Sequence, residues 1–490
     1  MIKKNRMQNL KKTYSQLPEE FHKSTNPTPV SKPKIICLNR SLANDLSIDT
    51  NDETQFLQYF SGNELPANSS PIAMAYAGHQ FGNFVPQLGD GRAILLGELF
   101  DKKGKHHDIQ LKGSGVTAFS RQGDGRSAVG PVIREYIISE AMHALNIPTT
   151  RALAAVSTGE NVLRETTQKG GILTRVSNSL IRVGTFEFFR ARQDLENLKL
   201  LADFTINRLF PQIPDEKNKY LLLFEAIAEK QSTLISKWMS IGFIHGVMNT
   251  DNFSVSGETI DYGPCAFMEA YDPNAVFSSI DRHERYKYSN QPKIALWNLS
   301  CLAGCLLPII VGNENEKEEM IQESLGTFSK DINSKINTAM TEKIGLKETK
   351  ESNDLVKDLL SIMHKNGADF TLTFRSLSLA IDNNDDHFLV CFDNIDQPKA
   401  WLKKWKKILH QANEKTENAI ESLNSINPIY IPRNHLIERA IREYEEENTH
   451  TIMDQLLQIT EKPFLEQENM QDYAIPAKDD ERVTQTFCGT

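Results

Sequence analysis

The residues best suited to chemistry lie in the segment GFIHGVMNTDNFSVSGETIDYGP, residues 242–264. An apolar start leads into a polar run that contains Asn252, and Asp261 follows further along. The β-type pattern of residues 253–261, with Gly257 at its turn, predicts a hairpin that would place Asn252 and Asp261 side by side. Two close oxygen ligands are what Mg²⁺ needs when nucleotide phosphates and water complete its octahedron. The segment therefore predicts a metal site that handles a nucleotide, with a solvated polar loop as the alternative.

The same segment has the spacing of two protein kinase motifs, H-R-D-x-x-x-x-N followed by D-F-G, in which the Asn and the second Asp hold metal ions. Here His245 begins the first motif, and Asp-Tyr-Gly at 261–263 forms the second. Val247 occupies the position of the catalytic aspartate, and a valine cannot accept a proton. Asp251, next to Asn252, is the carboxylate in this loop that could replace it as the base.

A strand and a helix nearer the N-terminus would position a lysine and a glutamate. The alternation in His107–Lys112 predicts a strand, and the apolar spacing after Pro131 predicts a helix with Glu135 on its first turn. Protein kinases use such a strand lysine and helix glutamate as an ion pair that orients phosphates. The pair therefore predicts a nucleotide contact, although such a spacing also arises by chance.

Two glycine loops and two arginines complete the candidate phosphate contacts. Glycines let backbone N–H groups approach phosphate oxygens, and a guanidinium group binds phosphate through two N–H groups at once. Hairpin turns, surface loops and surface salt bridges are the alternatives. The order of the features favours the joint prediction, because it is the order found in kinases. These candidates are Gly89, Gly91 and Arg92 in the first loop, Asp124 and Gly125 in the second, and Arg175 and Arg182 in strand-like runs.

The composition is ordinary for a soluble globular protein, with 39% hydrophobic and 24% charged residues among 490. A net charge of -9 argues against a general nucleic-acid surface. Six scattered cysteines without a C-x-x-C pair favour a reducing compartment and no structural zinc. The N-terminus lacks the apolar core of a secretion signal, and no window approaches 18 uncharged apolar residues. We therefore expect no membrane span and a cytoplasmic location.

The order of patterns predicts an α+β protein with the two-lobed fold of a protein kinase, because β-type patterns come first and helical patterns second. Two charged stretches, Asn313–Glu318 and Glu342–Asp354, are expected to be loops. The expected parts are an N-terminal extension at 1–70, a β-rich N-lobe with the glycine loops at 71–190, a helical C-lobe with the catalytic and metal loop at 191–430, and a C-terminal helical extension and tail at 431–490.

Several long segments of the chain resemble the selenoprotein O family, protein adenylyltransferases with a pseudokinase-like fold. The segments that carry the resemblance are YAGHQFGNFVPQLGDGRAILLGE, QLKGSGVTAFSRQGDGRSAVGPVIREYIISEAMHALNIPTTRALA, GFIHGVMNTDNFSVSGETIDYGPCAFMEAYDP and YSNQPKIALWNLSCLA. Together with an early NPTPV and a late NPIYIPRNHLIERAI, they extend over nearly the whole chain.

The resemblance implies transfer of AMP from ATP to a Ser, Thr or Tyr hydroxyl of a protein, with Mg²⁺ or Mn²⁺ and release of pyrophosphate. It also implies that ATP binds inverted relative to a kinase, so that the α-phosphate meets the metal ion and the acceptor. Asp251 is then the proton acceptor, and Asn252 and Asp261 hold the metal ion. The positions that match the family's nucleotide contacts are Lys112, Arg175 and Arg182 around the γ-end of ATP, and Gly89, Gly91, Arg92, Asp124 and Gly125 along the nucleotide.

The chain departs from some family members at its C-terminus, where Cys488 stands and those members carry a selenocysteine. Selenium chemistry is therefore not expected. We hypothesise that Cys488 and Cys265 form a disulfide that holds the tail across the site until it is reduced, and the alternative is an idle exposed thiol. Two other functions are also open. One is a kinase-like phosphotransferase, and the other is a non-catalytic nucleotide-binding module, which the valine at the base position would favour.

Overall fold

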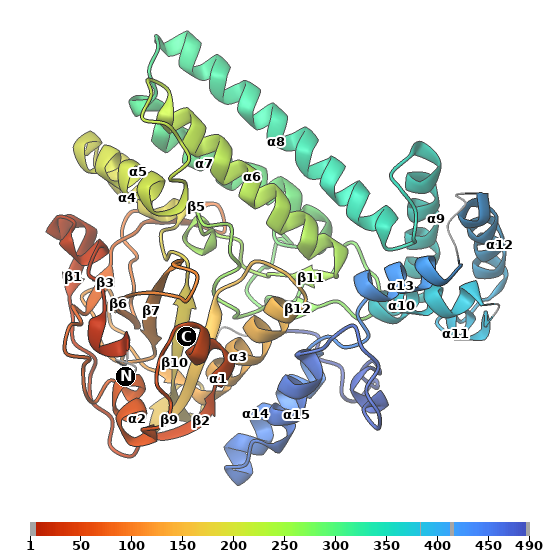
Figure 1. Cartoon of the computed structure of the whole chain (residues 1–490), viewed down its shortest axis with the longest axis horizontal. Coiled ribbons are helices and arrows are strands. Elements are labelled where there is room, and N and C mark those ends of the chain that lie inside the picture. The colour runs from red at the N-terminus through yellow and green to blue at the C-terminus, as the bar shows by residue number, and fades with distance from the viewer. Residues whose placement is uncertain (1–5, 383, 412–415, 487–490) are drawn as a thin grey trace.

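The computed structural model describes residues 6–382, 384–411 and 416–486. It has an α+β fold, with strands concentrated in the first part of the chain and helices in the rest (Figure 1). The strands are β1 His22–Ser24, β2 Lys34–Leu38, β3 Ile72–Met74, β4 Gly78–Gln80, β5 Asn83–Val85, β6 Ala93–Phe100, β7 His106–Lys112, β8 Ser127–Ala128, β9 Arg151–Leu163, β10 Thr167–Ser177, β11 Phe243–Ile244 and β12 Ala266–Phe267. The helices are α1 Arg40–Asp45, α2 Glu53–Ser61, α3 Val129–Ala144, α4 Val183–Ala191, α5 Leu195–Leu209, α6 Lys219–Ser240, α7 Gln291–Leu306, α8 Glu314–Glu342, α9 Lys350–Asn366, α10 Phe370–Ile381, α11 Asp386–Leu389, α12 Asp396–Gln411, α13 Thr416–Ile426, α14 Asn434–Glu447 and α15 Thr451–Thr460.

Eight strands form one antiparallel sheet in the order β1-β3-β6-β7-β10-β9-β2, with β8 paired to β10. Both edge strands come from the N-terminal segment that precedes β3. The longest strands are β9 and β10, with 13 and 11 residues. Their far ends carry polar residues, which the ladder between the two strands holds in place without an apolar alternation.

The predicted strand and helix around Lys112 and Glu135 are confirmed, except that Glu135 lies on the second turn of the helix and not on the first. In β7, Ile109 and Leu111 are fully buried in a core cluster on one face of the sheet. Helix α3 begins slightly before Pro131, which is tolerated because the first turn of a helix needs no donor there. Helix α3 packs on β9 and β10, and the C-terminal helices α14 and α15 pack on α3 (Figure 1).

The charged stretch Asn313–Glu318 is not a loop but the start of the 29-residue helix α8. Asn313 accepts a hydrogen bond from the backbone N–H of Glu316 (3.1 Å), and the Glu316 carboxylate accepts one from Asn313 N–H (2.9 Å). This reciprocal pair is a capping box, so its polar residues mark a helix N-terminus. The second stretch is a loop only between α8 and α9, because α9 begins at Lys350.

Within the described residues, the stretch Tyr288–Ile309 is long and apolar enough to cross a membrane by length and composition. The stretch contains Lys293 and several polar residues, so it is not a run of 18 uncharged apolar residues, and the absence of a membrane span stays a prediction. Half of its apolar window is buried inside the protein, and its helix α7 packs against α4, α6 and α8. A core helix meets the same criterion, and we interpret α7 in this way.

Residues 253–261 do not form the predicted hairpin. Ser254 pairs with Arg182, and Thr259 pairs with Thr149, so each half of the segment bonds to a different part of the protein. Burial does not alternate along the segment either, because the consecutive residues Phe253, Ser254 and Val255 are all buried.

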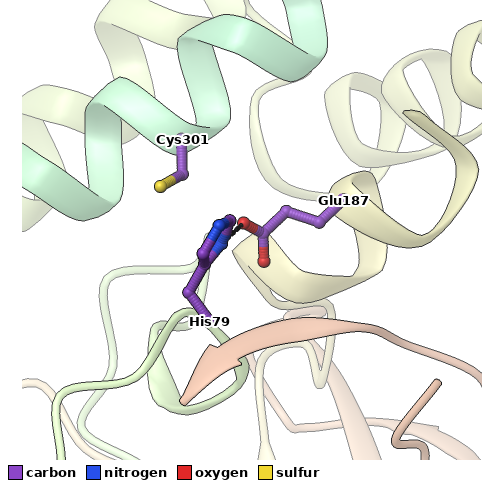
Figure 2. A group of neighbouring side chains, drawn as sticks. All are labelled: His79, Glu187 and Cys301. Atoms are coloured by element: carbon purple, nitrogen blue, oxygen red, sulfur yellow. Dashed lines mark hydrogen bonds and ion pairs between the residues drawn. The ribbon is translucent and has the colours of Figure 1, made fainter. Parts of the chain in front are cut away.

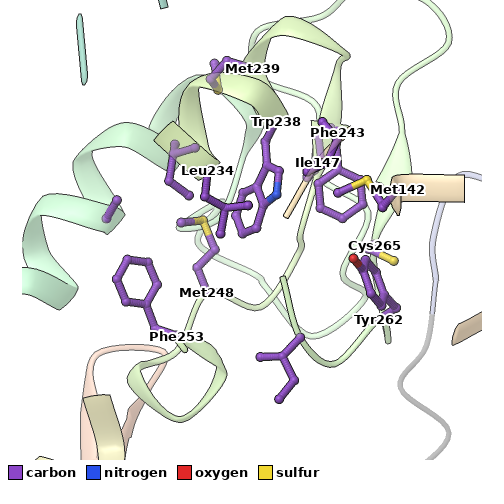
Figure 3. Close-up of a cluster of buried hydrophobic side chains, with 14 of the residues drawn as sticks. Met142, Ile147, Leu234, Trp238, Met239, Phe243, Met248, Phe253, Tyr262 and Cys265 are labelled. Carbon is purple, nitrogen blue, oxygen red and sulfur yellow. The ribbon is translucent and has the colours of Figure 1, made fainter. Parts of the chain in front are cut away.

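A buried apolar cluster lies beneath this segment (Figure 3). The ring of Phe243 in β11 lies 5.4 Å from that of Trp238 at the end of α6 and 6.1 Å from that of Tyr262. The indole N–H of Trp238 donates to Thr259 Oγ1 (2.9 Å). The cluster thereby fixes the chain on both sides of Asp261.

Candidate active site

A cavity of about 730 Å³ brings together every sequence-predicted site residue except Glu135, which is buried behind Lys112. This volume is within the range of roughly 300–1,000 Å³ typical of ligand sites. Basic side chains outnumber acidic ones in the lining, and an excess of positive charge in a concave site attracts phosphates. The basic residues are Arg92, Lys112, Arg121, Arg126, Arg164, Arg175 and Arg182, and the acidic ones are Asp90, Asp124, Asp251 and Asp261.

Three cations converge on Asp261. Its Oδ1 accepts hydrogen bonds from Lys112 Nζ (2.9 Å) and Arg175 Nη2 (2.6 Å), and its Oδ2 accepts one from Arg182 Nη1 (3.1 Å). Burial disfavours the charged carboxylate, but the three cations outweigh it and hold the pKa of Asp261 well below its usual value. Asp261 also has a left-handed backbone with φ 63°, which is uncommon outside glycine. The site is therefore built around an anion shared by three cations.

Glu135 on α3 holds two of the same cations from the other side. Its Oε2 accepts from Lys112 Nζ (2.6 Å), and its Oε1 accepts from Arg175 Nε (3.0 Å). Burial opposes its charge, but Arg175 and Lys112 outweigh the burial and lower the pKa of Glu135. The expected pair of Lys112 and Glu135 is present, and Arg175 joins it in one network.

Arg182 links this network to further buried groups. It is the N-cap of α4 and does not lie in a named strand, and its Nη1 also donates to the backbone oxygen of Asp251 (2.7 Å). Its guanidinium group lies 4.6 Å from the centre of the Tyr76 ring and 3.8 Å from Asp90 Oδ1. Burial raises the pKa of Asp90 although Arg182 opposes this. The sequence reasoning missed Tyr76 and Asp90, and the place of Asp90 between two glycines was the one available signal.

Asp251 is buried, and one of its carboxylate oxygens has no partner in the described part of the chain. Its Oδ2 accepts from Gln80 Nε2 (3.3 Å), whereas Oδ1 has no hydrogen bond there. Burial raises the pKa of Asp251 to about 6, against the effect of Arg182. A carboxylate in this state is suited to accept a proton near neutral pH. Next to it, Asn252 Nδ2 donates to Val247 O (3.1 Å), which leaves the amide oxygen of Asn252 for a ligand.

The glycines of the two loops are required by close contacts. Gly89 has φ 88°, and a Cβ there would lie 2.3 Å from the ring of Phe119. Gly125 has φ 66°, and a Cβ there would lie 2.1 Å from the carbonyl oxygen of Gly115. The segment that holds Gly89 and Gly91 leads from β5 to β6, which pair with other strands and not with each other. Side chains are thus excluded where the loops approach the cavity.

The second loop is tied to the turn between β9 and β10. Arg164 donates to both carboxylate oxygens of Asp124, from Nη1 at 2.9 Å and from Nη2 at 3.1 Å, and this lowers the pKa of Asp124. The backbone N–H of Arg126 donates to the same carboxylate (2.9 Å). The sequence held no signal for Arg164, because its role depends on the position of a distant hairpin.

The donor set fits a hard divalent cation bound together with a nucleotide. Asn252 and Asp261 both line the cavity and offer oxygen ligands, which Mg²⁺ and Mn²⁺ prefer. Asp251 lines the same cavity, and its buried Oδ1 has no hydrogen-bond partner among the described residues. Because three cations already surround Asp261, a metal ion is expected to need the negative charge of the phosphates beside it.

The hypothesis of a disulfide latch stays a prediction. Cys265 is fully buried in the apolar cluster beneath the site (Figure 3). Cys488 lies outside the described residues.

Comparison with known proteins identifies the family. The family model "Protein adenylyltransferase SelO" matches residues 5–461. The chain belongs to the SelO family. It is 49% identical over 479 residues to the protein nucleotidyltransferase YdiU of Maridesulfovibrio salexigens, covering 98% of this chain and 97% of that protein. It is 50% identical over 481 residues to YdiU of Agrobacterium fabrum, covering 98% and 99%. The family and the class of enzyme expected from the sequence motifs, a nucleotidyltransferase, are confirmed.

Proposed function

We propose that the protein transfers AMP from ATP to a hydroxyl group of an acceptor protein and releases pyrophosphate. Membership of a protein adenylyltransferase family supports the reaction class. The observation that carries the assignment of the site is the convergence of Lys112, Arg175 and Arg182 on Asp261, in a cavity that Asp251 also lines.

In this proposal the triphosphate shares the cations that Asp261 and Glu135 hold in place. A buried polyphosphate needs paired cations, and these side chains are already oriented by two carboxylates. The γ-end of ATP lies at these cations, so the nucleotide is inverted relative to a kinase. The residues proposed to line the nucleotide are Gly89, Gly91 and Arg92 in the first loop, Asp124 and Gly125 in the second, and Lys112, Arg175 and Arg182 at the phosphates.

Asn252 and Asp261 would hold the divalent ion, Mg²⁺ or Mn²⁺, which neutralises charge on the phosphate oxygens when bound. The guanidinium group of Arg182 donates to the backbone carbonyl of Asp251 and so positions that residue. The same group also donates to the carboxylate of Asp261. The chain thereby couples the phosphate end of the site to the proton-accepting end.

Asp251 is the proposed proton acceptor. The acceptor hydroxyl oxygen bonds to the α-phosphorus, the bond from that phosphorus to the bridging oxygen breaks, and pyrophosphate leaves with the electron pair. The hydroxyl proton passes to Asp251. With a pKa of about 6, this carboxylate is charged at neutral pH and still basic enough to take the proton.

We also propose the two-lobed kinase-like arrangement, with boundaries near residues 70, 190 and 430. Lys112 on β7 forms an ion pair with Glu135 on α3 and also contacts Asp261 of the D-x-G motif, which supports it. The acceptors would be Ser, Thr or Tyr residues of cytoplasmic proteins.

The test is the position of the transferred label. The protein is incubated with a cell lysate, divalent cation, and ATP labelled at either the α- or the γ-phosphate. Label on protein from α alone is the expected result. Label from γ alone would establish a phosphotransferase instead, and label from neither would establish a non-catalytic nucleotide-binding module.

A further inference from the structure

The hairpin of β4 and β5 contacts the catalytic loop, residues 249–252, at successive positions. The chain turns at Phe81 and Gly82, both with positive φ, which is the geometry of a tight two-residue hairpin turn. Nothing in the local sequence requires these contacts, because the two segments are far apart in the chain. The three contacts are His79 N–H to Thr250 Oγ1 (2.6 Å), Gln80 Nε2 to Asp251 Oδ2 (3.3 Å) and Phe81 N–H to Asn249 Oδ1 (3.0 Å).

Glu187 on α4 closes this contact into a ring. The hydroxyl of Thr250 donates to Glu187 Oε2 (2.5 Å), and His79 Nδ1 bonds to Glu187 Oε1 (2.5 Å), as Figure 2 shows for His79 and Glu187. Thr250 and Glu187 are buried, so water does not compete for these bonds. A hydroxyl that both accepts and donates within such a ring has one orientation.

The backbone approaches Asp251 closely on two sides. A Cβ on Gly78 of β4 would lie 2.6 Å from Asp251 Oδ1. A Cβ on Gly184 of α4 would lie 2.1 Å from Ala77 O and 3.4 Å from Asp251 Cα. Strand β4 and helix α4 therefore pack closely against Asp251. Helix α4 also has Arg182 at its N-cap.

We propose that His79, Thr250 and Glu187 are positioning residues for the transfer reaction, which act by fixing the direction of the Asp251 carboxylate. This inference rests on the proposed role of Asp251 as proton acceptor. Misplacement of a reacting group by about 1 Å can cost roughly 10²-fold in rate. Loss of the ring lowers the rate of transfer and leaves the binding of ATP, which other residues perform, nearly unchanged.

A metal site is the competing interpretation of the same group. Ligand atoms of His79, Glu187 and Cys301 all lie within 4.8 Å of one another (Figure 2). Two ligands at about 2.0–2.1 Å from one tetrahedral zinc ion are roughly 3.3 Å apart, whereas His79 Nδ1 and Glu187 Oε1 are 2.5 Å apart. Both oxygens of Glu187 are also in use. The geometry therefore favours the hydrogen-bonded ring.

The test replaces one hydroxyl group. Thr250→Val keeps the shape of the side chain and removes both bonds of its hydroxyl, whereas Thr250→Ser keeps the hydroxyl. Thr205→Val is the matched control, because Thr205 is equally buried on α5 and its hydroxyl donates only within that helix, to Leu201 O (2.8 Å). The readouts are kcat and KM for ATP in the α-label assay, with thermal melting as a check of folding.

We expect Thr250→Val to lower kcat by about 10- to 100-fold with KM for ATP within about threefold of wild type. Thr250→Ser and Thr205→Val should stay within about threefold in both constants. Equal activity of Thr250→Val and wild type, or a loss that serine does not restore, would overturn the proposal. If wild type itself transfers no label from the α-phosphate, the proposed function fails instead.

A second measurement separates the ring from a metal site. Equilibrium dialysis against Zn²⁺ alone compares wild type, Cys301→Ser and the neighbouring control Cys305→Ser. We expect the three proteins to bind the same amount of zinc. One equivalent bound by wild type and Cys305→Ser but not by Cys301→Ser would show a metal site and overturn the proposal.

Discussion

Two buried basic side chains of this protein, one in the active-site cavity and one among the C-terminal helices, have pKa values shifted in opposite directions. Arg175 in the cleft lies between two carboxylates, which outweigh the effect of burial and raise its pKa. Lys343, just after α8, is buried against Asn427 Oδ1 (2.8 Å) and the ring of Phe374 (4.6 Å). Burial lowers the pKa of Lys343 to about 7. A buried side chain therefore stays charged where an opposite charge lies close to it. Its neutral form is favoured where its described neighbours are an amide oxygen and an aromatic ring.

Two carboxylates inside the active-site cavity also have pKa values shifted in opposite directions. Asp261 keeps its charge because three cations contact it, whereas Asp251 is buried with a weak amide contact and has a pKa raised to about 6. One carboxylate is thus suited to hold cations and the other to exchange a proton. The different surroundings separate two roles that identical side chains would otherwise share.

The largest expected effect comes from removing the charge of Asp261. Asp261→Asn leaves Lys112, Arg175 and Arg182 without their common anion, and we expect transfer of α-label to fall by about 10³-fold or more. Asp358→Asn is the matched control, because Asp358 is an exposed partner of Lys404 and should leave turnover unchanged. Full activity of Asp261→Asn would show that the cluster of cations is structural.

Removal of the basic oxygen of Asp251 is expected to have the next largest effect. Asp251→Asn should slow transfer by about 10²- to 10⁴-fold, because it removes the proposed general base. Calorimetry on the same variant should show an affinity for ATP within a few-fold of wild type. An affinity that falls as far as the rate would make Asp251 a metal ligand instead.

Arg175→Met tests the ion-paired cation through its effect on the free energy of unfolding. It leaves Glu135 and Asp261 buried with one cation fewer, and we expect a loss of about 3–5 kcal/mol in the free energy of unfolding. Both carboxylates have lowered pKa values, so their stabilising contribution is present above about pH 4 and is lost as the pH falls through their folded-state pKa. The deficit should therefore shrink in acid. Urea denaturation measures it, and a deficit that is independent of pH would contradict the ion-pair explanation.

Lys343→Met tests the buried cation whose pKa is lowered. In contrast to Arg175→Met, this variant should raise the free energy of unfolding. The unfolded chain binds a proton at this lysine up to about pH 10.4, whereas the folded chain releases it above about pH 7. The stability of wild type therefore rises with pH between these values, and the methionine variant lacks this contribution. We expect the variant to be more stable at pH 7 by an amount on the order of a few kcal/mol and to lose this advantage towards pH 10. Parallel stability curves would contradict the lowered pKa.

The features that the sequence predicted correctly depend on local pattern. Strand β7 and helix α3 followed from apolar spacing. The glycines of the two loops were predicted for contact with phosphate, which stays a prediction, whereas the close contacts in the structure are with Phe119 and Gly115. The kinase-like order of lysine, glutamate and D-x-G motif then placed the main charged residues in one cavity. Local spacing is sufficient here because a strand or helix sets the direction of its own side chains.

The features that the sequence did not predict depend on contacts between distant segments. The false hairpin at 253–261 has the right alternation, but its partners are Arg182 and Thr149. The charged start of α8 became a helix N-terminus because a capping box satisfies its backbone.

By itself, the sequence determined the family, the α+β class and the candidate residues for binding phosphate and metal, because these are matters of residue type and local spacing. Only the tertiary structure decided that Asp261 is charged and Asp251 is suited to take a proton, because a pKa depends on neighbours brought together in space. It also decided that Thr250 meets His79, a residue 171 positions away in the chain.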